Sequence, residues 1–291
     1  MSDRWVVSHG DRELLSHNGL NTFDSLWDLN LDWFEAPNHR RNGWSGVSRH
    51  LLKRPDGGCC AVFVKRQQNH NFKSLFHPID GLPTTYREYR NICRLKANQI
   101  PCPDLVLYGH RRRCGQWQAI LITRALDGYQ PLEDCLDALA EDDVRCRAAL
   151  LASVAATVSR MHAHSLRHSS LYAKHIFVKP DTRRSIGGAT PRFDSAVIDL
   201  EKMRLGFPLF GVAVHDLDQL CRHWRRSEGD WESFMGSYLS HMRSRFTARW
   251  LKGAVVPRTV GQIDRRPPVL DVRSGAGVAA ETAAATETVS A

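Results

Sequence analysis

The stretch WSGVSRHLLKRPDGGCCAVFVK, residues 44–65, predicts a β-hairpin. Its first half contains the β-prone run from Val47 to Leu52, and its second half has the alternating run from Ala61 to Val64. Between the two runs, Pro55-Asp56-Gly57-Gly58 is a sequence typical of a chain reversal. Because strand-like runs joined by such a turn pair with each other, we expect the first sheet of the protein at this point.

Lys65 follows directly after the alternating run of the second strand of this hairpin. A charged side chain at such a position in a sheet requires an explanation. Contact with phosphate groups is one reason, and an edge-strand lysine that extends its charge into water is the other. Glu88 is the only Glu between Lys65 and Glu133, and it lies in a predicted helix. An ion pair between Lys65 and Glu88 would orient the ammonium toward phosphates. The alternative for Glu88 is a helix-capping box with Thr85.

The rest of the chain alternates between helical and strand-like segments. TTYREYRNICRLKANQI, residues 84–100, has helical spacing, and residues 104–125 are again rich in β-prone residues. After a break at Asp127-Gly128, helices are expected from Asp143 onward and near residues 216–224 and 231–242, with short strands at residues 176–178 and 196–198. The helix after Asp143 has one apolar stripe, which consists of Val144, Ala148, Leu151, Ala155, Val158 and His162. These segments predict an α+β fold.

Two further segments have residues suited to binding phosphate and metal. Gly43, Ser45 and Gly46 stand just before the first hairpin strand, and glycines three apart let backbone amides approach a phosphate chain. A plain turn uses the same residues. Asp199 directly follows the apolar pair Val197-Ile198, so a strand places a carboxylate at its end, where oxygen ligands suit magnesium. An isolated Asp after a strand is otherwise usually a turn former.

These motifs occur in an order that resembles a known family. The succession Gly43 to Gly46, Lys65, Glu88, the loop RHSSLYAKH (residues 167–175) and Val197-Ile198-Asp199 is similar to protein-kinase-like folds. It is most similar to the bacterial lipopolysaccharide kinase family, in its InaA-type branch, over about residues 35–245. Each motif is short, so the specificity of the resemblance comes from their order.

The resemblance implies a two-lobed, protein-kinase-like architecture. A small β-rich N-lobe would occupy residues 35–127, and a mainly helical C-lobe would occupy residues 128–262. Residues 1–34 would form an N-terminal extension. Residues 263–291 are expected to be a disordered tail, because from about residue 266 the chain lacks aromatic residues and cannot bury enough surface to fold.

The resemblance also implies ATP and Mg²⁺ as cofactors. Lys65, together with Gly43, Ser45 and Gly46, would bind the nucleotide, and Glu88 would pair with Lys65. Asp199 would hold the metal ion.

Two further residues acquire roles by the same resemblance. His175 would occupy the position where many kinases place a metal-binding Asn. Asp216, within HDLDQL, resembles the buried helix carboxylate that supports the catalytic loop through backbone amides. A solvent-facing Asp is the alternative for Asp216, and it is the expectation for Asp218.

One position departs from the kinase pattern. Five residues before the Asn position, kinases have an Asp that accepts the proton of the attacking hydroxyl, and here that position is Ser170. A serine is not a useful base at neutral pH. His168 would replace it if the loop moved the ring inward, because the pKa of histidine lies near neutrality. The role that we favour for His168 is that of a structural histidine.

The chain has a formal net charge of +9, which favours an anionic partner. The clusters are Arg111, Arg112 and Arg113, then Arg222, Arg225 and Arg226, then Arg243, Arg245 and Arg249. Solvated surfaces that keep the protein soluble are the alternative. We expect no specific nucleic-acid binding, because no nucleic-acid-binding motif accompanies the charge.

Compartment and metal content are constrained by simple counts. No apolar stretch reaches the roughly 20 residues that cross a bilayer, and the N-terminal residues do not resemble a signal peptide. The 8 cysteines have no CxxC spacing, so we interpret them as reduced thiols, mostly fillers. A zinc site among His162, His164, His168 and His175 is not favoured, because His162 and His164 point to different helix faces. We expect a cytoplasmic protein, with peripheral contact to the inner membrane as an option.

Three functions are compatible with these residues. The first is an ATP-dependent kinase that phosphorylates a sugar hydroxyl of lipopolysaccharide core, an anionic acceptor at the inner membrane face, as the resemblance implies. The second is a pseudokinase, a nucleotide-binding regulatory or stress-response module in which Ser170 records lost catalysis. The third is a basic nucleic-acid-associated protein that uses the same fold, which salt-dependent DNA binding without nucleotide dependence would reveal.

Overall fold

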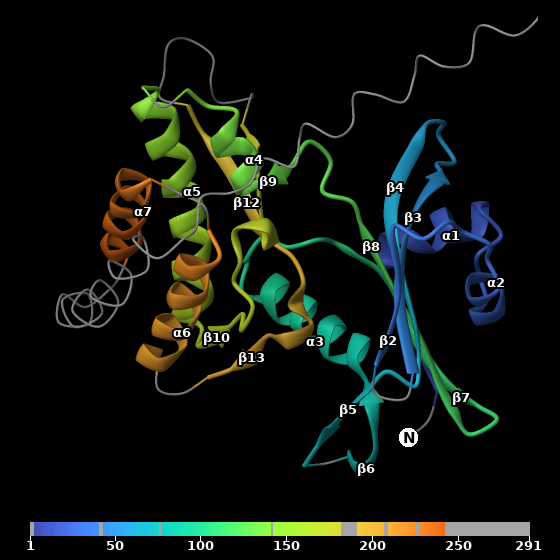
Figure 1. Ribbon diagram of the computed structural model, residues 1–291. Helices are drawn as coiled ribbons and strands as arrows, with labels where there is room; N and C mark the ends of the chain where they lie inside the picture. Colours follow the sequence, from blue (N-terminus) through green and yellow to red (C-terminus); the bar gives the residue numbers. More distant parts are fainter. Residues whose placement is uncertain are drawn as a thin grey trace, which may run out of the picture.

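The computed structural model describes residues 3–40, 43–75, 77–140, 142–181, 191–206, 209–224 and 227–241. Figure 1 shows a large sheet on one side, most of the helices on the other, and α3 (Thr84–Ala97) between them. The described residues contain both helices and strands, which confirms the mixed composition expected from the sequence. Residues 263–291, the expected disordered tail, lie outside the described residues.

The large sheet is antiparallel and has six strands in the order β1-β7-β8-β4-β3-β2. These strands are β1 (Arg4–Val7), β2 (Glu35–Arg40), β3 (Gly43–Lys53), β4 (Cys59–Gln68), β7 (Leu105–Arg113) and β8 (Gln116–Arg124). The predicted hairpin is confirmed, because β3 and β4 pair from Trp44 opposite Gln68 to Lys53 opposite Cys59. Its turn contains Gly57 at φ 89° and Gly58 at φ 77°. Residues other than glycine rarely adopt such positive φ values.

Lys65 lies on a central strand of this sheet. It stands opposite Val47 of β3 and opposite Leu121 of β8, so both edges of β4 are paired around it. The edge-strand interpretation of Lys65 is therefore wrong. Since successive residues of a strand face opposite sides, Lys65 shares its face with Val47 and Leu121, whereas Val64 and Arg66 point to the other face.

Residues 3–34 contribute one strand to the sheet and short helices that cover one of its faces. β1 pairs with β7, and η1 (His9–Asp11), α1 (Arg12–His17) and α2 (Phe23–Trp27) follow it. Leu26 of α2 is buried together with Val64 of β4, on the face opposite to Lys65. Arg66 donates hydrogen bonds from Nη1 to the carbonyl oxygens of Trp27 and Leu29, at 2.9 and 2.8 Å.

Helix α3 covers the face of the sheet to which Lys65 belongs. A separate hairpin of β5 (Asn71–Ser74) and β6 (His77–Pro83) leads into it. Tyr89 of α3 stacks on Tyr108 of β7, with ring centroids 4.6 Å apart. The N-cap residue is Pro83, without a side-chain cap, so the predicted capping box of Thr85 and Glu88 is wrong. The carboxylate of Glu88 is left for another partner.

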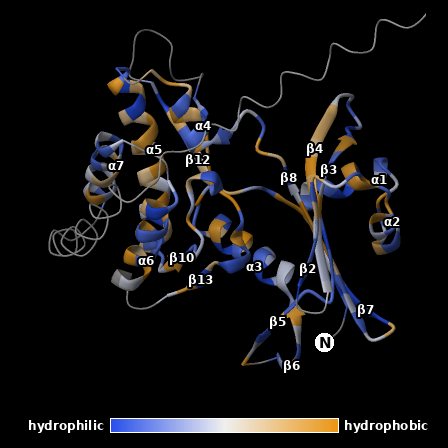
Figure 2. Ribbon diagram, viewed as in Figure 1, coloured by the Kyte–Doolittle hydropathy of each residue, from blue (hydrophilic) through white to orange (hydrophobic). Residues whose placement is uncertain are grey.

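The remainder of the described chain is mainly helical, with short strands. Its elements are β9 (Gln130–Pro131), α4 (Leu132–Asp137), α5 (Val144–Ala163), β10 (Leu166–Arg167), η2 (Ala173–His175), β11 (Ile176–Pro180), β12 (Phe193–Val197), η3 (Leu200–Lys202), β13 (Arg204–Leu205), α6 (Leu209–Arg222) and α7 (Glu228–Ser240). One continuous core joins Leu151 of α5 and Phe234 of α7 to Leu95 of α3. Figure 2 shows orange, hydrophobic stretches on α5 and on β4. Burial of each such side chain stabilises the fold by about 1.5–3 kcal/mol.

Helix α5 follows the predicted stripe except at its start. Leu151, Ala155, Val158 and His162 are buried, as expected. Val144 is 68% exposed, which contradicts its assignment to the stripe. It is the first residue of the helix, and the buried positions of α5 begin only at Leu150.

The first arginine cluster has acidic neighbours. Arg111, Arg112 and Arg113 end strand β7, and they pair with Asp24 and Asp80 at 2.7–3.2 Å. In the second cluster Arg222 pairs with Asp218 at 2.6 Å. The other members of the clusters, Arg225, Arg226, Arg243, Arg245 and Arg249, lie outside the described residues.

Two remaining expectations concern membranes and thiols. Among the described residues, no helix combines the length and apolarity that a membrane span requires. All of the cysteines are free, as Cys59, Cys60, Cys93, Cys102, Cys114, Cys135, Cys146 and Cys221. Within the described part of the chain, no three His, Cys, Asp or Glu side chains form a preformed metal cluster.

The packing of residues 3–34 against the sheet predicts a large effect of a single substitution. Leu26→Ala removes a fully buried side chain and should lower the free energy of unfolding by about 2–4 kcal/mol. Leu51→Ala, at a position that is 51% exposed on β3, is the control and should cost less than about 0.5 kcal/mol. Urea unfolding measures both values. Equal, small costs would show that the N-terminal helices do not contribute to the core.

Candidate active site

The ammonium group of Lys65 connects three segments of the chain. Its Nζ atom lies 2.8 Å from Oε2 of Glu88 on α3 and 3.1 Å from Oε2 of Glu201 on η3. The three side chains are largely enclosed, with exposed fractions of 18%, 14% and 15%. The predicted pair of Lys65 and Glu88 is thus observed, and a second carboxylate joins it.

The charges of this group shift its pKa values. Burial by itself lowers the pKa of Lys65, but the carboxylates of Glu88 and Glu201 outweigh burial and raise that pKa above its usual value. Burial also raises the pKa of Glu88, an effect that the charge of Lys65 opposes. Lys65 therefore stays protonated at neutral pH, beside two carboxylates.

Glu201 is held in place through its backbone. Asn91 of α3 donates from Nδ2 to the carbonyl oxygens of Leu200 and Met203, both at 2.8 Å. Arg87 donates from Nε to the carbonyl oxygen of Glu201 at 2.5 Å. Glu201 is not among the site residues predicted from the sequence. The signal that points to it is a carboxylate two residues after the strand-end Asp.

Asp199 precedes η3 in a strained backbone conformation. Its φ of 56° and ψ of 59° are left-handed, which is uncommon for a residue with a side chain and typical of functional sites. Its carboxylate remains 37% exposed, and its charge contributes to the raised pKa of Lys65. Oδ2 of Asp199 lies 3.7 Å from Nδ1 of His175. The structure thus brings Lys65, Asp199 and His175 into one neighbourhood.

The tautomer of His175 follows from its partners. Nδ1 lies 2.9 Å from the carbonyl oxygen of Ser170, and a carbonyl only accepts hydrogen bonds. Nδ1 therefore carries the proton, and in the neutral ring Nε2 has the lone pair. A neutral imidazole in this state can serve as a ligand or as a hydrogen-bond acceptor.

Asp216 is fully buried under the loop that precedes His175. Its carboxylate accepts backbone hydrogen bonds from the amides of His168, at 2.6 Å, and Ser169, at 2.9 Å. His162 and His215 also contact it, each at 3.2 Å. Against the effect of burial, these hydrogen bonds hold the pKa of Asp216 well below its usual value. The solvent-facing alternative does not apply to Asp216.

His168 and Ser170 are both buried. Nε2 of His168 donates to the carbonyl oxygen of Ile198 at 2.9 Å, which links the loop to the residue before Asp199. Burial lowers the pKa of His168, so the ring is neutral. Ser170 is 1% exposed, and its carbonyl oxygen accepts from His175 and Tyr172. In this arrangement a proton-accepting role for His168 would require the loop to move.

The glycines lie in strand β3 rather than in a loop before it. Lack of space explains why both positions are glycine. A side chain at Gly43 would meet the carbonyl oxygen of Gln68, and a side chain at Gly46 would meet the ring of Trp33. Gly46 therefore faces the side of the sheet opposite to Lys65. Ser45 lies on the same side as Lys65, and its Oγ accepts a hydrogen bond from Gln67 at 3.0 Å.

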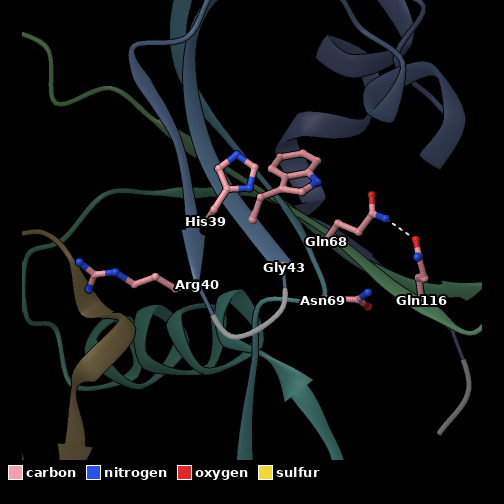
Figure 3. Close-up of a pocket in the computed structure, with 7 residues that line it drawn as sticks. His39, Arg40, Gly43, Gln68, Asn69 and Gln116 are labelled. Carbon is pink, nitrogen blue, oxygen red and sulfur yellow. Dashed lines mark hydrogen bonds between the residues drawn. The ribbon is translucent and has the colours of Figure 1, made fainter.

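A polar hollow of about 550 Å³ lies at the Gly43 end of β3. Figure 3 shows its residues, His39, Arg40, Gly43, Trp44, Gln68, Asn69 and Gln116. In the figure Gln68 and Gln116 form a hydrogen bond, and Arg40 extends away from the other side chains. Neither Lys65 nor Asp199 lines the hollow, so we assign the chemistry to the lysine and carboxylate group and not to this space.

Three comparisons with known proteins agree with one another. The model of the lipopolysaccharide kinase (Kdo/WaaP) family matches residues 24–238. Protein InaA of Escherichia coli (strain K12) is 31% identical over 222 residues, which cover 74% of this chain and 94% of that protein. The solved structure "WaaP in complex with acyl carrier protein" has a TM-score of 0.59 and 19% identity, covering 88% of this chain and 99% of that one. At that identity, the structural likeness shows the fold alone.

The burial of Asp216 predicts a large loss of stability on its removal. Asp216→Ala leaves two buried backbone amides without an acceptor and should lower the free energy of unfolding by about 3 kcal/mol. Asp218→Ala on the same helix breaks only an i, i+4 pair with Arg222 and should cost about 0.5 kcal/mol or less. Chemical denaturation of both variants decides the matter, and equal costs would contradict the supporting role.

The lowered pKa of Asp216 also sets the sign of a pH effect. The pKa of Asp216 is lower in the folded protein than in the unfolded chain. The ionised carboxylate therefore contributes fully to the free energy of unfolding at pH values above the unfolded-state pKa of about 4. That contribution should disappear as pH falls further. The difference in unfolding free energy between wild type and Asp216→Asn should therefore shrink from pH 6 to pH 3. A difference that grows on acidification would be contrary to this account.

Proposed function

Because the chain belongs to the lipopolysaccharide kinase (Kdo/WaaP) family, we propose that it is an ATP- and Mg²⁺-dependent phosphotransferase that acts on a sugar hydroxyl of lipopolysaccharide core. The resemblance to the InaA-type branch, inferred from the order of the motifs, is confirmed by the family match and by the relative InaA. The acceptor and the transfer reaction belong to the proposal.

The observation that supports nucleotide binding most strongly is the position of Lys65. Its ammonium is fixed between Glu88 and Glu201, beside the exposed carboxylate of Asp199. Phosphoryl transfer depends on positioning and electrostatic stabilisation, which a fixed cation next to a metal-binding carboxylate supplies. In the proposal, the sheet with α3 is the small lobe, and the segments after Asp127 form the large lobe.

The residues present fit a magnesium ion shared with nucleotide phosphates. Mg²⁺ usually binds through one or two carboxylates plus phosphate oxygens and water. Asp199, which is 37% exposed, supplies an oxygen ligand of this kind, and the ring of His175 lies beside it, with Nδ1 3.7 Å from Oδ2 of Asp199. When bound, the ion would offset the phosphate charge. We propose Asp199 as the metal ligand and His175 as a neighbour that orients it.

The proton of the acceptor hydroxyl has no Asp to receive it. Ser170 occupies that position and is buried, and His168 is engaged with Ile198. In the proposal both residues shape the loop instead of accepting the proton. Loss of one base lowers transfer without abolishing it, because positioning contributes most of the catalysis. Slow turnover is the expected result.

Ser170 supports a second candidate function. A pseudokinase would keep Lys65, Glu88 and Asp199 for nucleotide binding and would use the bound state as a regulatory signal. The acceptor is then irrelevant, and the protein responds to nucleotide alone. Turnover separates the two candidates, since both bind ATP.

The positive net charge of the chain agrees with an anionic acceptor. Lipopolysaccharide core presents phosphates and carboxylates at the inner membrane face, where the proposal places this protein as a cytoplasmic, peripheral enzyme. The charge of +9 favours encounter with such a surface. Nothing in the proposal requires nucleic acid.

Measurement of ATP binding and turnover with Mg²⁺ tests the proposal. Lys65→Ala and Asp199→Ala should each weaken ATP binding at least about tenfold, because charge-assisted contacts contribute about 1.5–3 kcal/mol. Lys53→Ala, at an exposed position of β3, is the control and should bind as wild type does. Transfer to core oligosaccharide that vanishes in both site variants supports the enzyme. Binding without any turnover supports the pseudokinase, and no binding by wild type defeats both.

A further inference from the structure

Two arginines face each other across a short pair of strands near the candidate active site. β10 and β13 pair antiparallel, with Leu166 opposite Leu205 and Arg167 opposite Arg204. Side chains at directly opposed positions of an antiparallel pair have Cβ atoms only about 4.5–5.5 Å apart. Like charges at such positions destabilise a sheet. An anion between the two guanidinium groups would remove this cost.

No carboxylate of the described residues forms an ion pair with Arg167 or Arg204. Nε of Arg167 is shielded from solvent and has no hydrogen-bond partner within the described part of the chain. The carboxylates of neighbouring segments have other partners: Glu201 contacts Lys65, Asp216 accepts from backbone amides, and Asp199 lies near His175. The positive charge at this place is therefore uncompensated by the described side chains.

Helix α3 approaches β13 through Asn91, which is also a hydrogen-bond partner of Arg94. Arg94 donates from Nη1 to Oδ1 of Asn91 at 3.0 Å, and the amide nitrogen of the same Asn91 reaches the carbonyl of Met203, the residue before Arg204. Burial, and then the charge of Arg90, lower the pKa of Arg94. Figure 1 shows β10 and β13 side by side next to α3. We call the opposed pair Arg167 and Arg204 the arginine seam.

We propose that the arginine seam is a binding site for a phosphate group. Guanidinium groups offer pairs of N–H donors that match the oxygens of a phosphate, and two such groups can share one tetrahedral anion. This site is distinct from the nucleotide position at Lys65, and its existence does not require that the protein bind ATP. The phosphate comes either from the free ion or from a phosphorylated sugar of the acceptor.

The arginine seam lies next to two segments of the candidate active site. β10 continues directly into His168, Ser169 and Ser170, and β13 begins one residue after η3, which contains Glu201. A phosphate held by Arg167 and Arg204 would fix these two segments relative to each other. The seam thus joins the loop that bears His175 to the segment that bears Asp199. Phosphate binding stabilises the arrangement of the candidate active site.

Calorimetric titration of the full chain with inorganic phosphate, without nucleotide, tests the proposal. Ionic strength is held constant with sodium chloride. Wild type should bind one phosphate per chain, and Arg204→Gln should bind it about tenfold more weakly. Arg204 is exposed, so this variant should fold. Arg167→Gln combined with Arg204→Gln should abolish binding, and Arg49→Gln, at an exposed position of β3, should leave it unchanged.

Equal phosphate affinity in wild type and Arg204→Gln would overturn the proposal, as would an absence of binding by wild type. The same variants titrated with Mg-ATP keep the two functions apart, because Arg204→Gln should retain the ATP affinity of wild type. A phosphorylated core oligosaccharide and its phosphatase-treated form identify the source. Competition by the phosphorylated form alone assigns the site to the acceptor, and competition by neither assigns it to free phosphate.

Discussion

The Lys65 ammonium is held by carboxylates from two separate segments, and the candidate active site depends on this arrangement. Glu88 comes from the helix that covers the sheet, and Glu201 comes from the turn after β12. The three side chains are mostly enclosed, so their attraction is screened less than that of a surface pair. These two contacts, and not the strand that bears Lys65, hold its ammonium group near Asp199.

The second constraint is the buried carboxylate of Asp216. It fixes the backbone of His168 and Ser169, and the ring of His168 in turn reaches Ile198. Hydrogen bonds thus connect the loop to the segment that follows β12, with Asp216 and His168 fully buried. This order is compatible with a positioning role for the loop even though its base position is occupied by Ser170. The arginine seam lies at the outer end of the same two segments.

Local patterns in the sequence predicted the hairpin, the helix of Glu88, most of the stripe of α5 and the Lys65 to Glu88 pair. Each of these depends on periodicity or on a single spacing. The sequence did not reveal that residues 3–34 join the sheet, because the pairing of β1 with β7 spans about a hundred residues and has no local signature. Glu201 was missed for a similar reason, since its role depends on where α3 places Asn91 and Arg87. The glycines were assigned to phosphate, whereas the packing of Trp33 explains Gly46.

A double-mutant cycle between Lys65 and Glu201 tests most directly whether these segments meet. The free energy of unfolding is measured for wild type, Lys65→Met, Glu201→Gln and the double variant. Contacting charged residues in a largely enclosed site should give a coupling energy of about 1 kcal/mol or more. A coupling indistinguishable from zero would mean that the turn after β12 does not hold the lysine, and the account of the site would then be wrong.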